Sequence, residues 1–278
     1  MKILIIGNGY LGKRCLGEWG NAVMAEKKVK TVQDAIDLLE THQPDVVLNA
    51  AGIVGKPNVD WCETHQLETV QGNTVMPFFL AQACQEKAIY LLHMGTGCIF
   101  YGQSQNGGPW KENDPANPVA VYTRTKYAAD LVLSTLTNVG IARIRMPIDY
   151  ISHPANLINK LASYKQVADV ENSVTVVEDM IKVFYQLLEK KASGIFHVTN
   201  PGSIKHREII ELYKKYVDSK HECSWLSEQE LVDVGLAKKK RSNNIMASEN
   251  LEKLGVNMRP IKEAVEDAIK KFTSGIDN

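Results

Sequence analysis

A tyrosine and a lysine one helical turn apart are the residues of this chain best suited to proton chemistry. They are Tyr122 and Lys126 in the run Tyr122-Thr123-Arg124-Thr125-Lys126, and on a helix their side chains share one face. A phenol with a pKa near ~10 is a poor acid-base group at neutral pH, but an adjacent ammonium stabilises the phenolate and lowers that value. We therefore expect Tyr122 to give a proton to a carbonyl oxygen as a hydride arrives at the carbon.

Spacing alone does not single out this pair, because Tyr216 and Lys220 repeat it. At the second pair, a helical tyrosine facing the core and a surface lysine explain the pattern completely. Tyr122 differs in its context: it opens a predicted helix that follows a strand at 89–93 and a Gly-, Asn- and Pro-rich loop at 102–118. That context predicts a position at the carboxyl edge of a parallel sheet, where such folds bind ligands.

Two further segments support the same chemistry. Thr96, in Gly95-Thr96-Gly97-Cys98, comes just after the fourth predicted strand, where its hydroxyl could polarise the same carbonyl or merely stabilise a turn. Thr96, Tyr122 and Lys126 together resemble the catalytic set of the short-chain dehydrogenases/reductases, which implies that Tyr122 and Lys126 also contact the cofactor and that Lys126 holds its nicotinamide ribose. Asn49-Ala50-Ala51-Gly52, at the end of the third strand, resembles the turn of that superfamily beneath the adenine side of the cofactor, which implies cofactor contacts for Ala50, Ala51 and Gly52.

A glycine-rich turn near the N-terminus predicts where a dinucleotide binds. The run Gly7-Asn8-Gly9-Tyr10-Leu11-Gly12 is a G-x-G-x-x-G between the first strand and the first helix. The first glycine permits a tight turn, the second lets a pyrophosphate approach the backbone, and the third allows close packing of helix on strand. The alternative is a glycine-rich turn that holds no ligand, but the coincidence of strand, motif and helix favours the dinucleotide.

The residues that would read the adenosine ribose carry conflicting charges. Glu26 could accept hydrogen bonds from a 2′-hydroxyl and favour NADH, whereas Lys27, Lys28 or Arg14 could neutralise a 2′-phosphate and favour NADPH. The same charges are also compatible with a solvated loop. We expect NADPH, with NADH as the alternative.

An α/β fold is predicted from the alternation of apolar runs and amphipathic stretches. Strands are expected at 2–6, 22–25, 45–49, 89–93 and 141–145, and helices at 10–19, 31–42 with Thr31 as N-cap, 67–86 and 122–137. This pattern indicates a Rossmann-type, doubly wound parallel sheet, with residues 1–147 as the NADP-binding domain. Residues 148–278 are expected to form a smaller α/β substrate lobe, with helices at 155–164, at 178–190 and after 203, an extended piece at 174–177 and a strand at 194–199 that returns to the main sheet.

Composition excludes several other classes of protein. The 278 residues include 32 basic and 32 acidic side chains and are 44% hydrophobic, which disfavours disorder and any general attraction to nucleic acid or anionic membranes. The chain has no apolar stretch of roughly 18 residues, so a cytoplasmic protein is expected. The five cysteines lack CxxC spacing and the seven histidines lack ligand spacing, so we expect free, mostly buried thiols and no metal.

Several segments resemble one family within that superfamily, the nucleotide-rhamnose synthase/epimerase-reductases, which are close to the dTDP-4-dehydrorhamnose reductases. The segments are VLNAAGIVGKPNVDWCE (47–63), GTGCIF (95–100), RIRMP (143–147), NLINK (156–160), NSVT (172–175), FHVTNPG (196–202) and RSNN (241–244). One departure is that Ile6 stands where extended members of the superfamily usually have the first glycine of G-x-x-G-x-x-G. The resemblance implies conversion of a nucleotide-linked 4-keto-6-deoxyglucose to L-rhamnose, by epimerisation at C3 and C5 and NADPH-dependent reduction at C4.

The epimerase half of that activity implies an acid and a base on opposite faces of the sugar ring. Cys98 and Lys160 are the candidates. Cys98 follows Thr96 by two residues, and a thiol can act as either acid or base. The resemblance implies a tyrosine at this place in simple reductases and puts Lys160 over the sugar. Without the resemblance, Cys98 would be interpreted as a small buried hydrophobic residue and Lys160 as an exposed helix lysine.

The expected substrate contacts come from both halves of the chain. Val54 and Asn58, in the segment after the third strand, should border the sugar, and Asn156, Arg241 and Asn244 are candidate partners of the nucleotide diphosphate. UDP- and dTDP-linked sugars both remain open, as does the oligomeric state, for which a homodimer is considered. The alternative functions are a monofunctional dTDP-4-dehydrorhamnose reductase and a non-catalytic NADP-binding regulatory subunit, although a regulator does not need the proton donor Tyr122.

Overall fold

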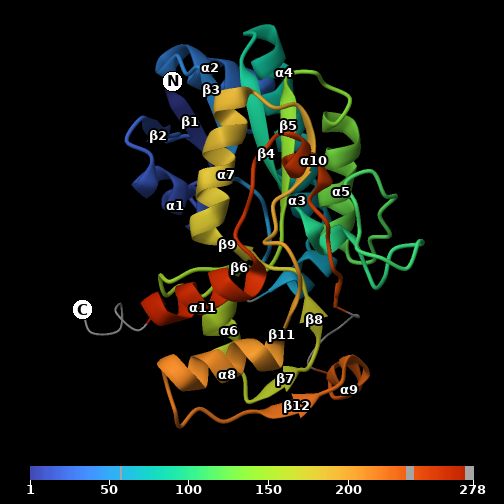
Figure 1. The fold of residues 1–278 in the computed structure, drawn as a ribbon. Helices are drawn as coiled ribbons and strands as arrows, with labels where there is room; N and C mark the ends of the chain where they lie inside the picture. The colour runs from blue at the N-terminus through green and yellow to red at the C-terminus, as the bar shows by residue number, and fades with distance from the viewer. Residues whose placement is uncertain (57, 236–240, 273–278) are drawn as a thin grey trace. The chain divides into compact units, whose positions relative to one another are not determined.

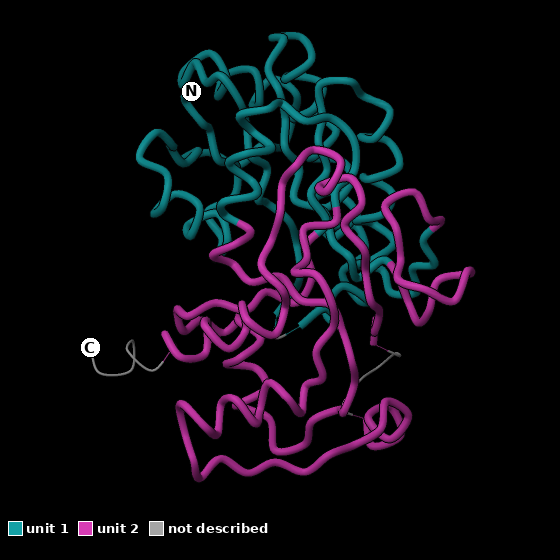
Figure 2. The backbone as a smooth tube through the Cα atoms, in the orientation of Figure 1, with its two compact units in different colours: residues 1–99, 116–143, 181–196 teal, residues 100–115, 144–180, 197–278 magenta. Residues whose placement is uncertain are grey.

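Two compact units make up the fold, and each is assembled from three separate segments (Figure 2). A computed structural model describes residues 1–56, 58–235 and 241–272. Unit 1 contains residues 1–99, 116–143 and 181–196, and unit 2 contains 100–115, 144–180 and 197–278. The sequence predicts a single boundary after Pro147. The structure differs because residues 100–115 belong to unit 2 and residues 181–196 belong to unit 1.

A six-stranded sheet in the order β10-β5-β4-β3-β1-β2 forms the centre of unit 1 (Figure 1). Strand β1 pairs in parallel with both β2 and β3, and β3 pairs in parallel with β4. The strand order therefore reverses at β1, which makes the crevice beside its carboxyl end the expected ligand site. The predicted doubly wound fold is confirmed, including the return of a late strand to the sheet. The strands are β1 Ile3–Ile6, β2 Ala22–Met24, β3 Val46–Asn49, β4 Tyr90–Thr96, β5 Val139–Ile144 and β10 Gly194–His197.

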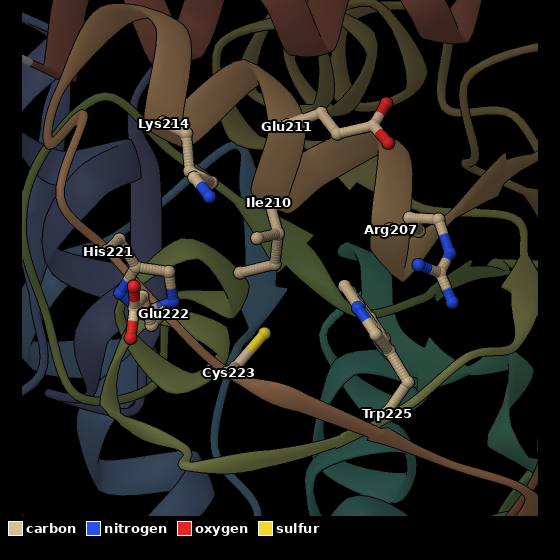
Figure 3. A pocket seen from close by; sticks show the side chains of 8 residues that line it. All are labelled: Arg207, Ile210, Glu211, Lys214, His221, Glu222, Cys223 and Trp225. Atoms are coloured by element: carbon tan, nitrogen blue, oxygen red, sulfur yellow. The ribbon is translucent and has the colours of Figure 1, made fainter.

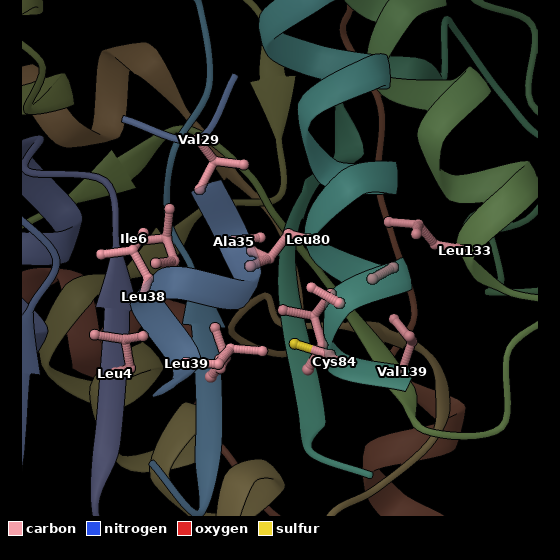
Figure 4. Close-up of a cluster of buried hydrophobic side chains, with 14 of the residues drawn as sticks. Leu4, Ile6, Val29, Ala35, Leu38, Leu39, Leu80, Cys84, Leu133 and Val139 are labelled. Carbon is pink, nitrogen blue, oxygen red and sulfur yellow. The ribbon is translucent and has the colours of Figure 1, made fainter. Parts of the chain in front are cut away.

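Helices α2 (Val32–His42), α4 (Met76–Glu86) and α5 (Val121–Leu133) pack their apolar side chains on one face of this sheet. Side chains alternate between the two faces of a strand, so Leu4 and Ile6 of β1 face this cluster and Ile3 and Ile5 face the other side of the sheet. Ile3 and Ile5 are buried as well. Burial on both faces explains why the strands read as continuous apolar runs. Figure 4 shows the cluster, which includes Leu4, Ile6, Leu38, Leu39, Leu80, Cys84, Leu133 and Val139.

The helix boundaries agree with the sequence where a capping residue marks them. Thr31 is the N-cap of α2, as predicted, and forms a capping box with Asp34. Helix α1 spans Tyr10–Glu18 and α7 spans Val177–Lys190. The single helix predicted at 67–86 is instead α3 (Gln66–Val70), a π-helical turn (Gln71–Val75) and α4.

Unit 2 contains short paired strands and a helical layer with its own core. Helices α6 (Leu157–Ser163), α8 (His206–Tyr216) and α11 (Ile261–Phe272) contribute most of the buried apolar side chains. Because α8 ends at Tyr216, Tyr216 and Lys220 do not share a helical turn. The paired strands are β6 Pro147–Ile148 with β9 Thr175–Val176, β7 Gln166–Ala168 with β12 Ser224–Leu226, and β8 Glu171–Asn172 with β11 Ile204–Lys205.

The remaining elements are short. The 3₁₀ turns span Val59–Glu63 and Gly97–Ile99 in unit 1, and the helices α9 and α10 span Glu228–Asp233 and Glu249–Lys253 in unit 2. Of the five free cysteines, Cys15, Cys62 and Cys84 are buried, as expected for structural thiols. Among the described residues, no helix is long and apolar enough to cross a membrane.

A buried ion pair joins α5 to β5 inside unit 1. The Arg143 guanidinium lies 2.8 Å from the Asp130 carboxylate, and both side chains are almost fully buried. Arg143→Met keeps much of the side-chain volume but removes the cation that is paired with the buried Asp130 carboxylate. We expect this variant to lose about 3–5 kcal/mol of free energy of unfolding, measured by urea denaturation.

The exposed pair Lys87 and Glu40 serves as the control, since its 2.7 Å contact is even shorter. Lys87→Met should cost less than about 1 kcal/mol because water screens both charges. Equal losses in the two variants would show that burial does not determine the strength of the Asp130–Arg143 pair.

Candidate active site

Three of the predicted catalytic residues meet where β4 ends and α5 begins. Thr96 is the last residue of β4, and Tyr122 lies in the first turn of α5. The side chains of Thr96 and Tyr122 are hydrogen bonded, and Cys98 lies close enough to act electrostatically on the phenol. The Thr96 hydroxyl also accepts a hydrogen bond from the Cys98 backbone N–H at 3.1 Å. A carbonyl presented to Tyr122 would therefore meet a hydroxyl and a thiol in the same place.

Lys126, one turn after Tyr122, is directed at β4. Its Nζ donates to the Met94 carbonyl oxygen at 2.8 Å and lies 3.1 Å from His93 Nε2. The sequence predicts a Tyr122 pKa lowered by Lys126, but burial raises the pKa of Tyr122, and the negative charge of a Cys98 thiolate would raise it further. Burial lowers the pKa of Lys126 to about 8, against the opposing effect of Asp130. The lowering of the Tyr122 pKa expected from the sequence is therefore not seen, because Lys126 points to the strand.

The partner of Lys126 is a residue that the sequence reasoning missed. His93 is fully buried, and its Nδ1 lies 3.0 Å from Asn49 Nδ2 on the neighbouring strand β3. A chain of polar groups thus runs from Asn49 through His93 to Lys126 inside the sheet layer. The signal available in the sequence is a histidine within the otherwise apolar run of β4, although it does not reveal what the imidazole contacts.

Asn73 is a second residue that the sequence reasoning missed. It lies in the π-helical turn, and such turns are frequent at functional sites. The Asn73 side chain accepts from the Ile53 N–H at 2.7 Å and donates to the Ile53 carbonyl at 2.9 Å. It also donates to the Thr125 hydroxyl on α5 at 3.3 Å. Asn73 therefore ties the loop after β3 to the helix that carries Tyr122.

The geometry of the glycine-rich turn suits a dinucleotide phosphate. Gly7 has φ +111°, and a Cβ there would lie 2.4 Å from the Ala51 backbone nitrogen. A Cβ on Gly12 would lie 2.2 Å from the Gly7 carbonyl oxygen, so both positions need glycine. Gly9 differs because a Cβ there would meet no atom within 4 Å. Gly9 is the N-cap of α1, whose first-turn amides can therefore be approached by an anion.

In unit 2, Lys160 is exposed on α6, and Asn156 forms the N-cap of that helix. The Asn156 amide donates to the carbonyl oxygens of Asp149 and Ile151 at 2.7 and 3.0 Å, and its oxygen accepts from the Ile158 N–H. Both amide hydrogens are thus used within the fold. The side chain is also fully buried, so its observed role is to hold the loop before α6 rather than to present a donor to a diphosphate.

Asn244 has a comparable role in unit 2. It is buried, and its amide donates to the Phe100 carbonyl at 2.7 Å and to the Ser242 hydroxyl at 3.1 Å. Arg241 is partly buried, and the preceding basic residues 238–240 lie outside the described residues. In unit 1, Val54 is 54% exposed, and Asn58 is an exposed N-cap that accepts from the Asp60 N–H. Residue 57 of that predicted sugar-facing segment is also outside the described residues.

Comparison with known proteins shows the family to which the chain belongs. The model of the RmlD substrate binding domain matches residues 1–274, which is almost the whole chain. The chain belongs to this family. The membership predicted from the sequence segments is thereby confirmed.

The relatives of this RmlD-family chain include rhamnose-forming enzymes. It is 34% identical to an Arabidopsis thaliana protein named bifunctional dTDP-4-dehydrorhamnose 3,5-epimerase/dTDP-4-dehydrorhamnose reductase, over 92% of this chain and 87% of that one. It is 35% identical to a trifunctional A. thaliana protein whose name includes UDP-4-keto-6-deoxy-D-glucose 3,5-epimerase and UDP-4-keto-L-rhamnose-reductase, over 95% of this chain but only 41% of that one.

Solved structures support the fold of the RmlD-family chain. The L780 UDP-rhamnose synthase of Acanthamoeba polyphaga mimivirus superposes with a TM-score of 0.89 and 29% identity, covering 98% of this chain and 99% of that one. A dTDP-4-dehydrorhamnose reductase of Bacillus anthracis, solved in complex with NADP, superposes with a TM-score of 0.82 over the full length of both chains. At 20% identity the second likeness shows the fold alone.

The residues expected to read the adenosine ribose lie on the surface after β2. Glu26, Lys27 and Lys28 are all exposed, whereas Arg14 is mostly buried and pairs with Glu18 at 3.1 Å. The two lysines are thus the residues of this set that can turn toward a 2′-phosphate without breaking an existing ion pair. This arrangement supports the expectation of NADPH.

The glycine turn allows a prediction that separates ligand binding from folding. Gly9→Ala should fold normally but weaken NADPH binding at least about tenfold, because the new methyl group projects where a phosphate must approach the backbone. Gly12→Ala should instead lose about 1–3 kcal/mol of stability, because its methyl group clashes with the Gly7 carbonyl.

Cofactor fluorescence and thermal denaturation measure the two effects separately. Unchanged NADPH affinity in a folded Gly9→Ala protein would mean that the phosphates lie elsewhere.

Unit 2 also contains a pocket that no sequence motif predicted. It has a volume of about 370 Å³ and lies between α8 and the segment that leads into β12 (Figure 3). The Arg207 guanidinium lies 4.2 Å from the centre of the Trp225 ring and pairs with Asp169. The lining combines Arg207 and Lys214 with Glu211 and Glu222, so it gives no net attraction for an anionic nucleotide. We therefore do not assign the nucleotide to this pocket.

Proposed function

We propose that this protein converts a nucleotide-linked 4-keto-6-deoxyglucose to the corresponding nucleotide-L-rhamnose, as a 3,5-epimerase and NADPH-dependent 4-reductase. The observation that carries this proposal is the meeting of Tyr122, Thr96 and Cys98 at the carboxyl end of β4. A reductase needs the first two groups, whereas the thiol has no task in reduction. The names of the two A. thaliana relatives support the same pair of activities.

In the reduction, the residues of α5 and β4 handle the proton. Tyr122 donates its phenolic proton to the oxygen at C4, and Thr96 donates a hydrogen bond to the same oxygen, so that the developing negative charge is stabilised. NADPH, when bound at the glycine-rich turn, supplies the hydride for C4. The raised pKa of Tyr122 keeps the phenol protonated at neutral pH and hence ready to donate.

In the epimerisation, protons leave and return at C3 and C5. The C4 carbonyl acidifies both positions, so a base on one face of the ring can remove a proton and form an enolate, and an acid on the other face can return a proton with inverted configuration. We assign these tasks to Cys98 and Lys160. This half of the reaction needs no NADPH, and it must precede the reduction, because reduction removes the C4 carbonyl that acidifies C3 and C5.

The test supplies the keto-sugar nucleotide and NADPH without any separate 3,5-epimerase. The expected result is consumption of NADPH and formation of nucleotide-L-rhamnose. If NADPH is consumed only after an epimerase is added, the protein is a plain reductase. If the protein binds NADPH but turns over neither the UDP- nor the dTDP-linked sugar, it is a regulatory subunit. Running both nucleotides in parallel also identifies the preferred one.

A further inference from the structure

We propose that His93 is a positioning residue that holds the neutral amine form of Lys126 against β4. This inference goes beyond the proposed reduction. Only the kinetic consequence of the His93–Lys126 contact rests on the proposed function. Three hydrogen-bonded contacts carry the proposal: Ala51 to Asn49, Asn49 to His93, and His93 to Lys126. All three lie within unit 1.

The first contact determines which way the Asn49 amide points. The backbone N–H of Ala51 lies 3.1 Å from Asn49 Oδ1, and a backbone N–H can only donate. The reversed amide would place two donors against each other. Asn49 Nδ2 must therefore face His93, where it donates to Nδ1 at 3.0 Å.

The second contact determines the tautomer of His93. Because Nδ1 accepts from Asn49, it carries no proton, and a neutral imidazole must then carry its proton on Nε2. Burial, the larger cause, lowers the pKa of His93 well below its usual value, and a charge on Lys126 would only lower it further, so the ring is neutral in both proton states of Lys126. The Nε2–H of His93 points at Lys126 Nζ, 3.1 Å away.

The third contact determines the proton state of Lys126. An ammonium has three hydrogens and no lone pair, so it cannot accept from His93 Nε2–H. The 3.1 Å contact is a hydrogen bond only when Lys126 is a neutral amine, which accepts from His93 and donates to the Met94 carbonyl. When Lys126 gains a proton, the bond to His93 is lost and Nζ must turn to another acceptor.

The groups around Lys126 define a balance between the two proton states. His93 on β4 favours the neutral amine. Asp130 on α5, itself paired with Arg143 of β5, favours the ammonium, and Tyr122 lies one turn before Lys126 on the same helix. Proton donation in the proposed reduction leaves a phenolate on Tyr122, and an ammonium at Lys126, one turn away, would stabilise that negative charge. His93 therefore opposes the ammonium form of Lys126 and adds to the effect of burial, so that the ammonium is lost at a lower pH.

Nitrogen NMR of histidine side chains in the whole, wild-type protein tests the tautomer directly, and other histidines provide controls. His197 Nδ1 lies 2.8 Å from the Ala247 carbonyl and His206 Nδ1 lies 3.0 Å from the Ala168 carbonyl, so both must carry the proton on Nδ1. We expect the opposite tautomer at His93, with the proton on Nε2. A proton on His93 Nδ1 would overturn the proposal, and this readout needs no turnover.

His93→Gln tests the kinetic consequence. A glutamine can turn its carbonyl oxygen toward Lys126 and accept from an ammonium, which raises the pKa of Lys126. The wild-type kcat/KM for reduction should fall as the pH rises through the pKa of Lys126, about 8, because the ammonium is lost. In His93→Gln this alkaline limb should move up by about one pH unit or more.

His206→Gln is the control, because His206 lies in unit 2. This variant should not shift the alkaline limb of the kcat/KM profile. An activity loss in His93→Gln that is equal at every pH, with an unmoved limb, would reduce His93 to a packing role. If His93→Gln does not fold, the tautomer in the wild-type protein still decides. The expected tautomer in a protein that reduces no keto-sugar would leave the His93 assignment standing and remove the proposed function.

Discussion

Tyr122→Phe should reduce the rate of 4-keto reduction by about 10²–10⁴-fold, the range typical for removal of a positioned acid. Phenylalanine keeps the ring at the start of α5 but removes the proton that the oxygen at C4 needs. The Thr96 hydroxyl remains and can still donate a hydrogen bond, so a residual rate is expected. The measurement is NADPH consumption with the C3,C5-epimerised keto-sugar nucleotide as substrate, which removes the epimerase from the assay.

Tyr127→Phe is a matched control on the same helix. The Tyr127 hydroxyl accepts a 3.4 Å hydrogen bond from the Ala116 backbone, which is a local contact of unit 1. Its loss should change the reduction rate less than about threefold, since a weak, partly exposed hydrogen bond is worth about 0.5 kcal/mol. A comparable fall in both variants, or retained reduction in Tyr122→Phe with unchanged NADPH affinity, would remove Tyr122 from the role of proton donor.

Cys98→Ala should abolish epimerisation and leave reduction largely intact. Without the thiol, exchange of the C3 and C5 protons with deuterated solvent should fall at least about 100-fold. Reduction of a keto-sugar that is already epimerised should persist, because the Thr96 hydroxyl accepts its hydrogen bond from the Cys98 backbone, which alanine retains. Mass spectrometry of the product measures the deuterium, and NADPH consumption measures the reduction.

Cys223→Ala is the control for the loss of a thiol, because Cys223 is also a partly buried free cysteine but belongs to unit 2. Deuterium exchange should be unaffected in this variant. Exchange that survives in Cys98→Ala would exclude Cys98 from the epimerisation. A loss of both activities in Cys98→Ala would mean instead that the thiol supports the positions of Thr96 and Tyr122.

Local patterns in the sequence were sufficient for most of unit 1. The strands are runs of apolar residues buried on both faces, and Thr31 marks the start of α2, so these boundaries were predicted to within a few residues. The meeting of Thr96 with Tyr122 was also predictable, because both follow from the order of strand, loop and helix. The boundaries depend on residues that are close together in the chain, and the meeting of Thr96 with Tyr122 follows from the rule that loops after parallel strands lie at one edge of the sheet.

The features that the sequence did not predict depend on contacts between distant residues. His93 and Asn49 are 44 positions apart, and the sequence of β4 does not indicate that its histidine contacts an asparagine of β3. The π-helical turn contains Asn73, whose side chain bonds to Ile53, 20 positions earlier, and hydrophobic periodicity does not reveal such a contact. Lys126 illustrates the effect on function, since its pairing with Tyr122 was predicted from spacing but its contacts are with β4.

Unit 1 is assembled from three separate segments of the chain, and this affects both its folding during synthesis and the fragments that can fold alone. During synthesis, the central sheet cannot be completed until residues 194–197 have left the ribosome, because β10 is its outermost strand beside β5. A fragment that stops at residue 147 would contain the whole glycine-rich turn but would leave β5, with its apolar residues, as a bare edge open to pairing with other molecules. Residues 1–147 therefore should not fold as an independent domain. Expression of this fragment should yield aggregates rather than a small NADPH-binding protein.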